Sequence, residues 1–283
     1  MELSIITVNY HHSHLLRDSL ESVNLTVKEI QFEVIVVDNS FKDEGLESVL
    51  NQFPETRLID NSTNLGFACA NNQGAEVAKG DFLLFINPDT IIKEGAIEAM
   101  LEHLRSDPSV GIIGPKVLNP NGTIQYSCRK FPTIWSGLFN RYSLMTRLFP
   151  NNRYSRDYLM SDYDHSWTRS VDWVSGCCMM IPAPIFKKIN GFDENYFLFI
   201  EDIDLCQAMK KEGYLVNYFP SAQIFHKISS SNARINPQTI IKRHKGMIYY
   251  YKKHNETNFL AQWAVSSLIM ARCFFQLIFN IVK

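Results

Sequence analysis

The chain has 283 residues, of which 46% are hydrophobic, so it can form one large domain or two small ones around a sizeable core. Its formal net charge of -1 excludes the strongly basic surface typical of nucleic-acid-binding proteins, and we expect no nucleic-acid partner. The six cysteines include no C-x-x-C pair and predict neither a zinc site nor a set of disulfides. The first apolar run follows Met1 almost at once, without a basic leader, so we expect a cytoplasmic protein.

Short apolar runs alternate with helix-like segments over the first 90 residues. The expected elements are, in chain order, a strand at 3–8, a helix from Ser13, a strand at 32–37, a helix at about 45–53, a strand at 57–60, a helix at about 65–77 and a strand at 82–86. This alternation predicts a parallel sheet wound with helices on both faces. No G-x-G-x-x-G follows the first strand and no G-x-x-x-x-G-K-[ST] occurs, which argues against a dehydrogenase and a P-loop NTPase.

The strand expected at 82–86 brings a carboxylate to the edge of this sheet. Five consecutive apolar residues suit a strand covered on both faces, and Pro88 ends the pairing because it has no N–H group. Ligands of open α/β sheets bind outside the carboxyl ends of the strands, so Asp89 is expected where a substrate binds. Taken alone, an ordinary turn residue is the more common role for an Asp after Pro.

The second half is less regular. The expected elements are a helix at about 95–105, a strand at 110–117, a strand at 171–181, a helix beginning near Pro184, a helix opening at Glu201, a strand at 214–219 and a further segment that ends at His226. Periodicity fades between 119 and about 170, and irregular segments of this length are usually lids or binding segments. Asp202 lies at a helix N-terminus, where the dipole and free N–H groups favour the anion. Helix capping is the alternative role for Glu201, Asp202 and Asp204.

Four motifs occur in a set order: Asp38 at the end of the second strand, the Asn64-Leu65-Gly66-Phe67 turn, Asn87-Pro88-Asp89, and Glu201-Asp202. Over roughly residues 3–230 the chain resembles the family 2 glycosyltransferases with the GT-A fold, in particular their bacterial rhamnosyltransferase branch. Each motif alone is a weak signal, and the resemblance depends on their order and spacing. It implies an α/β fold with a Rossmann-like nucleotide-binding half and a mixed central sheet. It also implies inverting transfer from a nucleotide sugar, with Mg²⁺ or Mn²⁺ on the diphosphate.

The resemblance also assigns roles to residues. It implies that Asp202 is the catalytic base with Glu201 as its supporting neighbour, and that Asp89 holds the metal. His226 is a second candidate metal ligand, with a structural histidine as the alternative. The residues expected to form the donor site are Thr7, Asn9, Asp38, Asn64, Gly66, Asn72, Asn87, Trp173 and Gly176.

Three of these assignments have particular features. Asp38 is expected to contact the nucleotide base, and an Asx-turn residue is its alternative role. Trp173 either shapes the sugar or acceptor pocket or is a core aromatic. Many relatives carry Asp-x-Asp where this chain has Asn87-Pro88-Asp89, which leaves one carboxylate fewer. Since Mg²⁺ usually takes only one or two protein carboxylates, Asp89 alone can suffice.

The C-terminal segment is basic and aromatic at 240–253 and largely apolar at 259–282. The apolar stretch is long enough to span a bilayer, but Arg272 near its middle makes spanning expensive, so we predict one or two amphipathic helices in the membrane interface. The alternative is a helix packed on the catalytic domain or on a second subunit of a homodimer. We therefore expect a catalytic domain at 1–235, divided into a nucleotide-sugar-binding half (1–118) and an acceptor-binding half (119–235), and a membrane-associating tail at 236–283.

These observations predict a transferase on the inner face of the cell membrane, working in bacterial O-antigen or cell-wall polysaccharide synthesis. Its expected substrates are a dTDP- or UDP-sugar donor, with dTDP-L-rhamnose preferred, and a polyprenyl-diphosphate-linked glycan acceptor. The alternatives are a UDP-dependent transferase of another sugar and a non-catalytic nucleotide-sugar-binding protein. A sugar nucleotidyltransferase is disfavoured, because Asn9-Tyr10-His11-His12 is not a Gly-rich basic loop.

Overall fold

A computed structural model of the protein describes residues 1–133, 148–149, 152–227 and 235–282. The described strands are β1 (Leu3–Asn9), β2 (Phe32–Asp38), β3 (Arg57–Asp60), β4 (Phe82–Ile86), β5 (Thr90–Ile92), β6 (Val110–Leu118), β7 (Ile124–Gln125), β8 (Cys128–Arg129), β9 (Arg169–Ser170), β10 (Trp173–Val174), β11 (Cys178–Pro182) and β12 (Leu215–His226). The described helices are α1 (Ser13–Thr26), α2 (Leu46–Leu50), α3 (Phe67–Val77), α4 (Ala96–Ser106), α7 (Arg153–Leu159), α8 (Ala183–Lys188), α9 (Glu201–Lys211), α10 (Pro237–His254) and α11 (Phe259–Val282).

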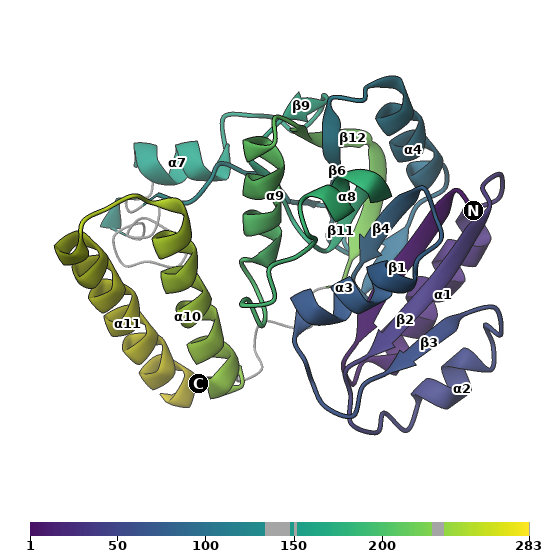
Figure 1. Ribbon diagram of the computed structural model, residues 1–283, viewed down its shortest axis with the longest axis horizontal. Helices are drawn as coiled ribbons and strands as arrows, with labels where there is room; N and C mark the ends of the chain where they lie inside the picture. The colour runs from purple at the N-terminus through teal and green to yellow at the C-terminus, as the bar shows by residue number, and fades with distance from the viewer. Residues whose placement is uncertain (134–147, 150–151, 228–234, 283) are drawn as a thin grey trace.

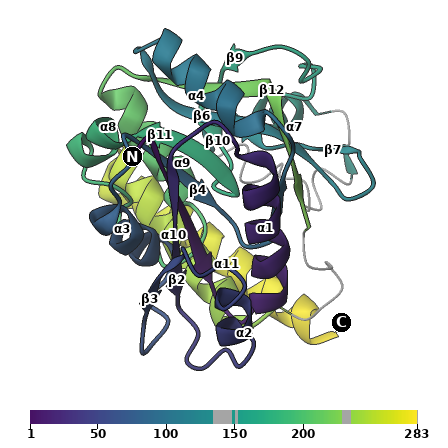
Figure 2. The same ribbon diagram turned by 90° about the vertical axis from the view of Figure 1, so that its right-hand side faces the viewer.

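Strands β1 to β4 are parallel to one another in the order β3-β2-β1-β4, as the alternating pattern of the first 90 residues predicts. Alternate side chains of β1 face opposite cores: Ile6 belongs to the buried cluster that includes α3, and Ile5 to the cluster that includes α1. Figure 2 shows α1 and α3 on opposite sides of these strands. The parallel register sets Asn9 beside Asp38, so the polar residues at the strand ends gather at one edge of the sheet.

The second half completes a mixed sheet, as expected. Strand β11 pairs antiparallel with β4, and the sheet continues through β6 and β12 to β5. Strand β5 was not predicted; it pairs antiparallel with the end of β12 and sets Thr90 opposite His226. The strand expected at 214–219 and the segment after it form the single strand β12, whose register with β6 shifts between Phe219 and Gln223.

Three boundaries differ from expectation. The strand expected at 171–181 is divided into β10 and β11, because β10 leaves the main sheet to pair with β8. Helix α2 ends at Leu50 and not near Phe53. Pro54 disfavours the helical conformation of Phe53, the residue before it, so the helix ends before this residue. The irregular segment 119–170 contains the short elements β7, β8, α7 and β9, while residues 134–147 and 150–151 lie outside the described residues.

The two C-terminal helices form a separate layer beside α9 (Figure 1). Helix α10 is anchored to the catalytic part, because the Lys253 ammonium lies 2.7 Å from carboxylate oxygens of both Asp193 and Asp204. His254 Nε2 is 2.6 Å from the other oxygen of Asp204, which is buried. Buried ion pairs with more than one partner hold a geometry firmly, since losing one partner strands a charge in the interior.

Helix α11 packs on α10 and leaves much of its apolar side uncovered. Among the described residues, α11 is the one helix that is long and apolar enough to cross a membrane, over Phe259–Ile281. Of its apolar 18-residue stretch, 11% is buried inside the protein. Its most exposed large side chains are Phe259, Leu260, Trp263, Phe274, Phe275, Phe279 and Ile281. The contacts of α10 match the packing alternative for this segment, whereas the outer side of α11 has no covering element among the described residues.

Candidate active site

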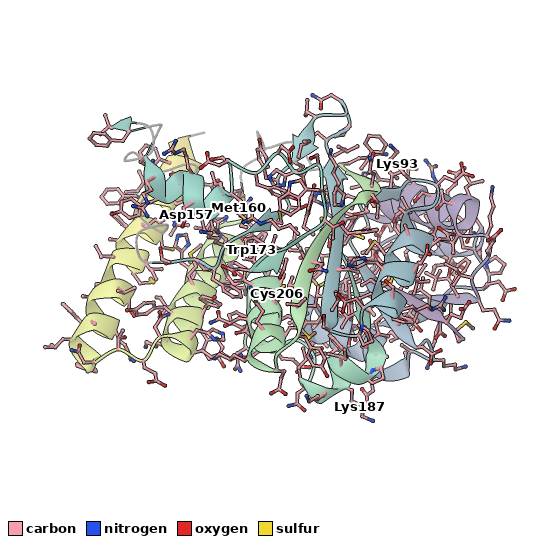
Figure 3. All side chains as sticks on the ribbon, turned by 90° about the horizontal axis from the view of Figure 1, so that it is seen from above. Lys93, Asp157, Met160, Trp173, Lys187 and Cys206 are labelled. Atoms are coloured by element: carbon pink, nitrogen blue, oxygen red, sulfur yellow. The ribbon has the colours of Figure 1, made fainter. Side chains whose placement is uncertain are left out.

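A cavity of about 1070 Å³ opens between the edge of the sheet and the C-terminal helices. Residues from both halves of the chain line it, and Figure 3 shows Trp173 lying between the C-terminal helices and the sheet. The predicted residues in its lining are Asn64, Gly66, Asn87, Asp89, Trp173, Gly176, Glu201, Asp202 and His226. The two carboxylates that the sequence singled out, far apart along the chain, therefore share one cavity.

Asp89 and His226 form a pair of potential metal ligands in this cavity. Asp89 follows the strand-ending Pro88, and His226 is the last residue of β12. Asp89 Oδ1 and His226 Nε2 are buried and 3.1 Å apart, which is within ion-pair distance, and neither atom has a hydrogen-bond partner. Two buried polar atoms that converge without hydrogen-bond partners indicate a place for a ligand.

The other ring nitrogen of His226 is held by a chain of amide groups on the β6–β7 hairpin. Nδ1 is 2.7 Å from Gln125 Oε1, and the Gln125 side-chain NH₂ donates to Asn119 Oδ1 at 3.1 Å. The Asn119 NH₂ in turn donates to Thr123 Oγ1. Because Gln125 offers its oxygen to the ring, Nδ1 carries the proton in the neutral imidazole and Nε2 presents its lone pair toward Asp89.

These two residues fit a divalent cation. Adjacent ligands of an octahedral ion with bonds of about 2.1 Å lie about 3 Å apart, which matches the Asp89–His226 separation. Among the residues that the structure describes, no group of three or more His, Cys, Asp or Glu side chains forms a complete metal cage. A site with two protein ligands suits an ion that shares its coordination with a diphosphate and water, as Mg²⁺ does in nucleotide-dependent enzymes.

Asp202 lies at the start of α9, and its carboxylate accepts two backbone hydrogen bonds. Oδ2 accepts from the Gly176 N–H at 3.0 Å and Oδ1 from the Ile203 N–H at 2.9 Å. Burial raises the pKa of Asp202, while these N–H groups and the Arg129 guanidinium offset part of the rise. Burial thus outweighs the helix N-terminus, contrary to our expectation of an easily ionised group. A carboxylate with a raised pKa is a better proton acceptor near neutral pH.

Glu201 differs from its neighbour. Its side chain is buried, with 5% of the residue exposed, and its Oε2 has no hydrogen-bond partner. Burial and the adjacent charge of Asp202 raise the pKa of Glu201 well above its usual range. Two buried carboxyl groups this close along the chain disfavour each other's charge, so the pair binds protons more tightly than two exposed carboxyl groups would.

The backbone around Asp202 is closely fitted. A Cβ at Gly176 would lie 3.2 Å from the Cβ of Asp202, so only glycine lets this N–H approach the carboxylate without displacing it. Phe199 and Ile200, which precede α9 and line the cavity, have φ of 66° and 77°. Positive φ is strained for a β-branched residue such as Ile200, and such strain concentrates at functional segments.

Arg129 is a cavity residue that the sequence did not reveal. Its guanidinium carbon lies 5.3 Å from the Trp173 ring and 5.8 Å from the Tyr158 ring. Its buried Nε has no hydrogen-bond partner. Trp173, 6% exposed, is a core aromatic whose indole N–H donates to the Lys130 carbonyl, and it also lines the cavity. No local signal marks Arg129, which lies in the segment without periodicity.

The Asn64–Phe67 turn is fixed by side-chain amides and a glycine. Asn64 Oδ1 accepts from the Gly66 N–H at 2.9 Å, and the buried Asn39 donates to the Gly66 carbonyl at 3.0 Å. Gly66 has φ of 95°, and a Cβ there would lie 2.7 Å from the Phe197 carbonyl oxygen. The close approach joins this turn to the segment before α9. Asn39 also lines the cavity and was not among the predicted site residues.

Thr7 and Asn9 are both fully buried and lie outside the lining of the cavity. Strand β1 is central, and layers on both sides cover its side chains. Asn9 donates to Asp38 Oδ1 at 2.9 Å and to Asp43 Oδ2 at 3.0 Å. Asn9 therefore fixes the carboxylates of Asp38 and Asp43 relative to β1, and the donor-binding role of Thr7 and Asn9 stays a prediction.

Asp38 and Asn72 also lie outside the lining of the main cavity. Asp38 is 3% exposed and borders a smaller adjoining hollow that includes Asp43 and Asp60. Asn72 exchanges two hydrogen bonds with the Phe192 backbone, at 2.8 and 2.9 Å, and so fastens α3 to the segment that leads to α9. Asn72 thus frames the site through the backbone, not through its lining.

Comparison with known proteins assigns the class. Residues 4–189 match the sequence profile described as "Glycosyl transferase family 2". A mannosyltransferase from Pyrobaculum calidifontis, solved with GDP-Man and Mn²⁺, aligns with 99% of this chain and 73% of its own at a TM-score of 0.61; at 16% identity this shows the fold alone, the GT-A fold. The chain belongs to glycosyltransferase family 2, and it is a glycosyltransferase.

The named relatives are more particular. The N-acetylglucosaminyl-diphospho-decaprenol L-rhamnosyltransferase of Mycobacterium tuberculosis (strain ATCC 25618 / H37Rv) is 28% identical over 265 residues, which cover 89% of this chain and 85% of the relative. Rhamnosyltransferase WbbL of Escherichia coli (strain K12) is 26% identical over 240 residues, covering 81% of this chain and 84% of the relative. The resemblance to a rhamnosyltransferase branch is thus confirmed at the level of homologues.

Proposed function

We propose that this glycosyltransferase moves L-rhamnose from dTDP-rhamnose to a polyprenyl-diphosphate-linked glycan, with inversion at the transferred carbon, in bacterial O-antigen or cell-wall synthesis. The two rhamnosyltransferase relatives support the sugar, and the printed name of the mycobacterial one supports a diphospho-polyprenol acceptor. A UDP-dependent transferase of another sugar is the alternative donor assignment within the family.

The observation that carries this proposal is the shared cavity of Asp202 and the Asp89–His226 pair. Inverting transfer needs a base on the acceptor hydroxyl and charge stabilisation on the leaving diphosphate. Asp202, ionised and oriented by the Gly176 N–H, accepts the proton of the attacking hydroxyl.

A divalent cation bound by Asp89 and His226 would neutralise the charge that develops on the diphosphate. Imidazole suits Mn²⁺ better than Mg²⁺, so the pair favours Mn²⁺. Within the donor half (1–118), Asn64, Gly66 and Asn87 frame the nucleotide sugar. Asp38 receives the base through the adjoining hollow. Trp173 and Gly176, which lie in the acceptor half (119–235), shape the sugar or acceptor pocket.

The proposal extends to the membrane. The tail, residues 236–283, carries seven Lys and Arg residues and a single acidic residue, Glu256, although the whole chain has a net charge of -1. Its α11 exposes Trp263, Phe275 and Phe279 with 66%, 59% and 70% of their surface. Aromatic side chains on one face and cations nearby are the features by which a helix lies on an anionic bilayer. We therefore propose peripheral attachment to the inner face of the cell membrane.

A thermal-shift panel of dTDP-, UDP- and GDP-sugars, with and without Mn²⁺, tests the donor. A ligand at a hundredfold excess over its Kd stabilises the folded state by about 2.7 kcal/mol, which raises the melting temperature by roughly 5 °C or more. We expect the largest rise with dTDP-rhamnose and Mn²⁺, followed by rhamnose transfer in an activity assay. A larger rise with a UDP-sugar selects the alternative donor, and no rise with any sugar nucleotide rejects the proposal.

Vesicle flotation tests the attachment. Phe275→Glu with Phe279→Glu should release the protein from phosphatidylglycerol vesicles, because carboxylates on the apolar face oppose insertion and repel the anionic surface. Phe41→Glu is the matched control, since Phe41 is 66% exposed on the catalytic part. Equal flotation of the double variant and the control would exclude α11 as the contact surface.

A further inference from the structure

The only charged side chain of α11, Arg272, faces the cavity. Val265, Leu268, Ile269 and Arg272 all line the cavity, and their spacing places them on one face of the helix. From the sequence we expected this arginine to make it expensive for the helix to span a bilayer. The structure turns it away from the exposed apolar face and toward the same space as Asp202.

Arg272 is close to a second cavity arginine, Arg243 of α10. Burial lowers the pKa of Arg272, and the positive charge of Arg243 lowers it further. Among the described residues, no ion pair within 4 Å joins Arg272 to an acidic side chain. Arg272, which is buried beside a second guanidinium group and has no acidic partner among the described residues, carries an electrostatic cost that a bound anion would offset.

The position of this pair restricts the source of the anion. It lies on the wall formed by α10 and α11, whereas the Asp89–His226 pair lies at the edge of the sheet. An α-helix with its side chains is about 10 Å across, so an Arg on one face of α11 lies at roughly headgroup depth when the opposite face rests in a bilayer. A phosphate that arrives from the membrane side would meet Arg243 and Arg272 before its attached sugar reaches Asp202.

We infer that Arg243 and Arg272 bind the diphosphate of the lipid-linked acceptor and so set the acceptor sugar in front of Asp202. Guanidinium groups match phosphate oxygens with paired hydrogen bonds, and two of them suit the two phosphates. This inference rests on the proposed function, because it presupposes a diphosphate-linked acceptor. It adds the residues that hold this acceptor and gives α11 a second role besides membrane contact.

The test uses farnesyl diphosphate, a short isoprenoid diphosphate, as a binding probe for the full-length protein. Saturating dTDP with Mn²⁺ is present throughout to occupy the donor site. We expect the wild type to bind farnesyl diphosphate but not farnesol, and Arg243→Gln with Arg272→Gln to weaken binding about tenfold or more. The matched control is Lys245→Gln, which removes an exposed cation of α10 that does not line the cavity.

Each outcome separates one alternative. Unchanged farnesyl diphosphate affinity in the double variant overturns the inference. So does wild-type binding of the probe that is seen only when dTDP is left out, because that result would identify the donor site as the probe's location. Weaker flotation of the double variant on phosphatidylglycerol vesicles, without loss of probe binding, would show that the arginines contact phospholipid headgroups. If the double variant unfolds, Arg272→Lys replaces it in the binding test, and its melting temperature shows whether it is folded. If no sugar nucleotide binds but the arginine effect persists, the proposed function fails and the anion site stands.

Discussion

The two walls of the cavity are built in different ways. The sheet-edge wall, which includes Asn64, Gly66, Asn87 and Asp89, comes from residues that follow successive strands of the first half. The tail-side wall comes from β8, β10, the start of α9 and the two C-terminal helices. Neighbouring parallel strands assemble the first, while long-range contacts such as Lys253–Asp204 hold the second.

This difference shows which site residues can be placed from the local sequence pattern. An apolar run followed by polar residues places its polar end at a sheet edge, since parallel strands end at the same edge. The tail-side wall has no such rule, because which side chains meet depends on how separate segments pack. The proposed mechanism uses residues of both walls, and the following substitutions perturb one wall at a time.

The largest expected effect is on the tail-side wall. Asp202→Asn removes the proton acceptor and keeps the shape, so turnover should fall by at least about a hundredfold. Affinity for the donor nucleotide should be unchanged, because Asp89 and His226 are intact. Steady-state kinetics and calorimetric titration with dTDP measure the two quantities. Near-normal turnover, or an equal loss of nucleotide affinity, would show that Asp202 is not the base.

The matching substitution in the sheet-edge wall is Asp89→Asn, which removes the charge of the metal-ligand pair. We expect Mn²⁺ affinity in the presence of dTDP to fall by at least about a hundredfold, since even outer partners of metal ligands contribute tenfold to a hundredfold. Calorimetric titration with Mn²⁺ measures this affinity. The control is Asp81→Asn, because Asp81 lies at the opposite end of β4 from Asp89. Unchanged Mn²⁺ affinity would remove Asp89 from the metal site.

A smaller effect is expected at Gln125, which contacts His226 and not the ion. Gln125→Leu removes the acceptor of the Nδ1 proton, so the ring can take the other tautomer and Mn²⁺ affinity should fall about tenfold. Nitrogen NMR of His226 in the metal-free protein reports the tautomer independently of activity. Gln125→Glu keeps an acceptor oxygen and should preserve the Nδ1–H tautomer. An unchanged spectrum in the leucine variant would assign the ring orientation to packing alone.

The smallest effect concerns stability and pH. The pKa of Glu201 is raised on folding above its ordinary value of 4.5, so its stabilising contribution is complete below pH 4.5 and is lost as pH rises through the folded-state value. Glu201→Gln has the same shape and no such loss. At pH 8 this variant should melt about 2 °C or more above the wild type, and at pH 4 the two should coincide. A variant that is less stable at pH 8 would contradict the burial argument.

The sequence was sufficient for the fold class and for part of the site. The alternation of apolar runs placed β1, β2, β3 and β4 within a residue or so of their observed bounds, and it located Asp89 at a sheet edge. The start of α9 at Glu201 was also predicted. It did not indicate that Thr7 and Asn9 are fully buried, because burial from both faces of a central strand depends on the layers that cover it.

What the sequence by itself determined is the set of local features: strand periodicity, turn residues and the order of motifs, which together identify the family. Only the tertiary structure decided that Arg129, Arg243 and Arg272 line the same cavity as Asp202, that Gln125 orients His226, and that burial raises the pKa of Glu201 and of Asp202. The physical reason is range. Backbone preference and hydrophobic alternation act over a few residues, whereas desolvation and charge pairing depend on atoms that distant segments bring together.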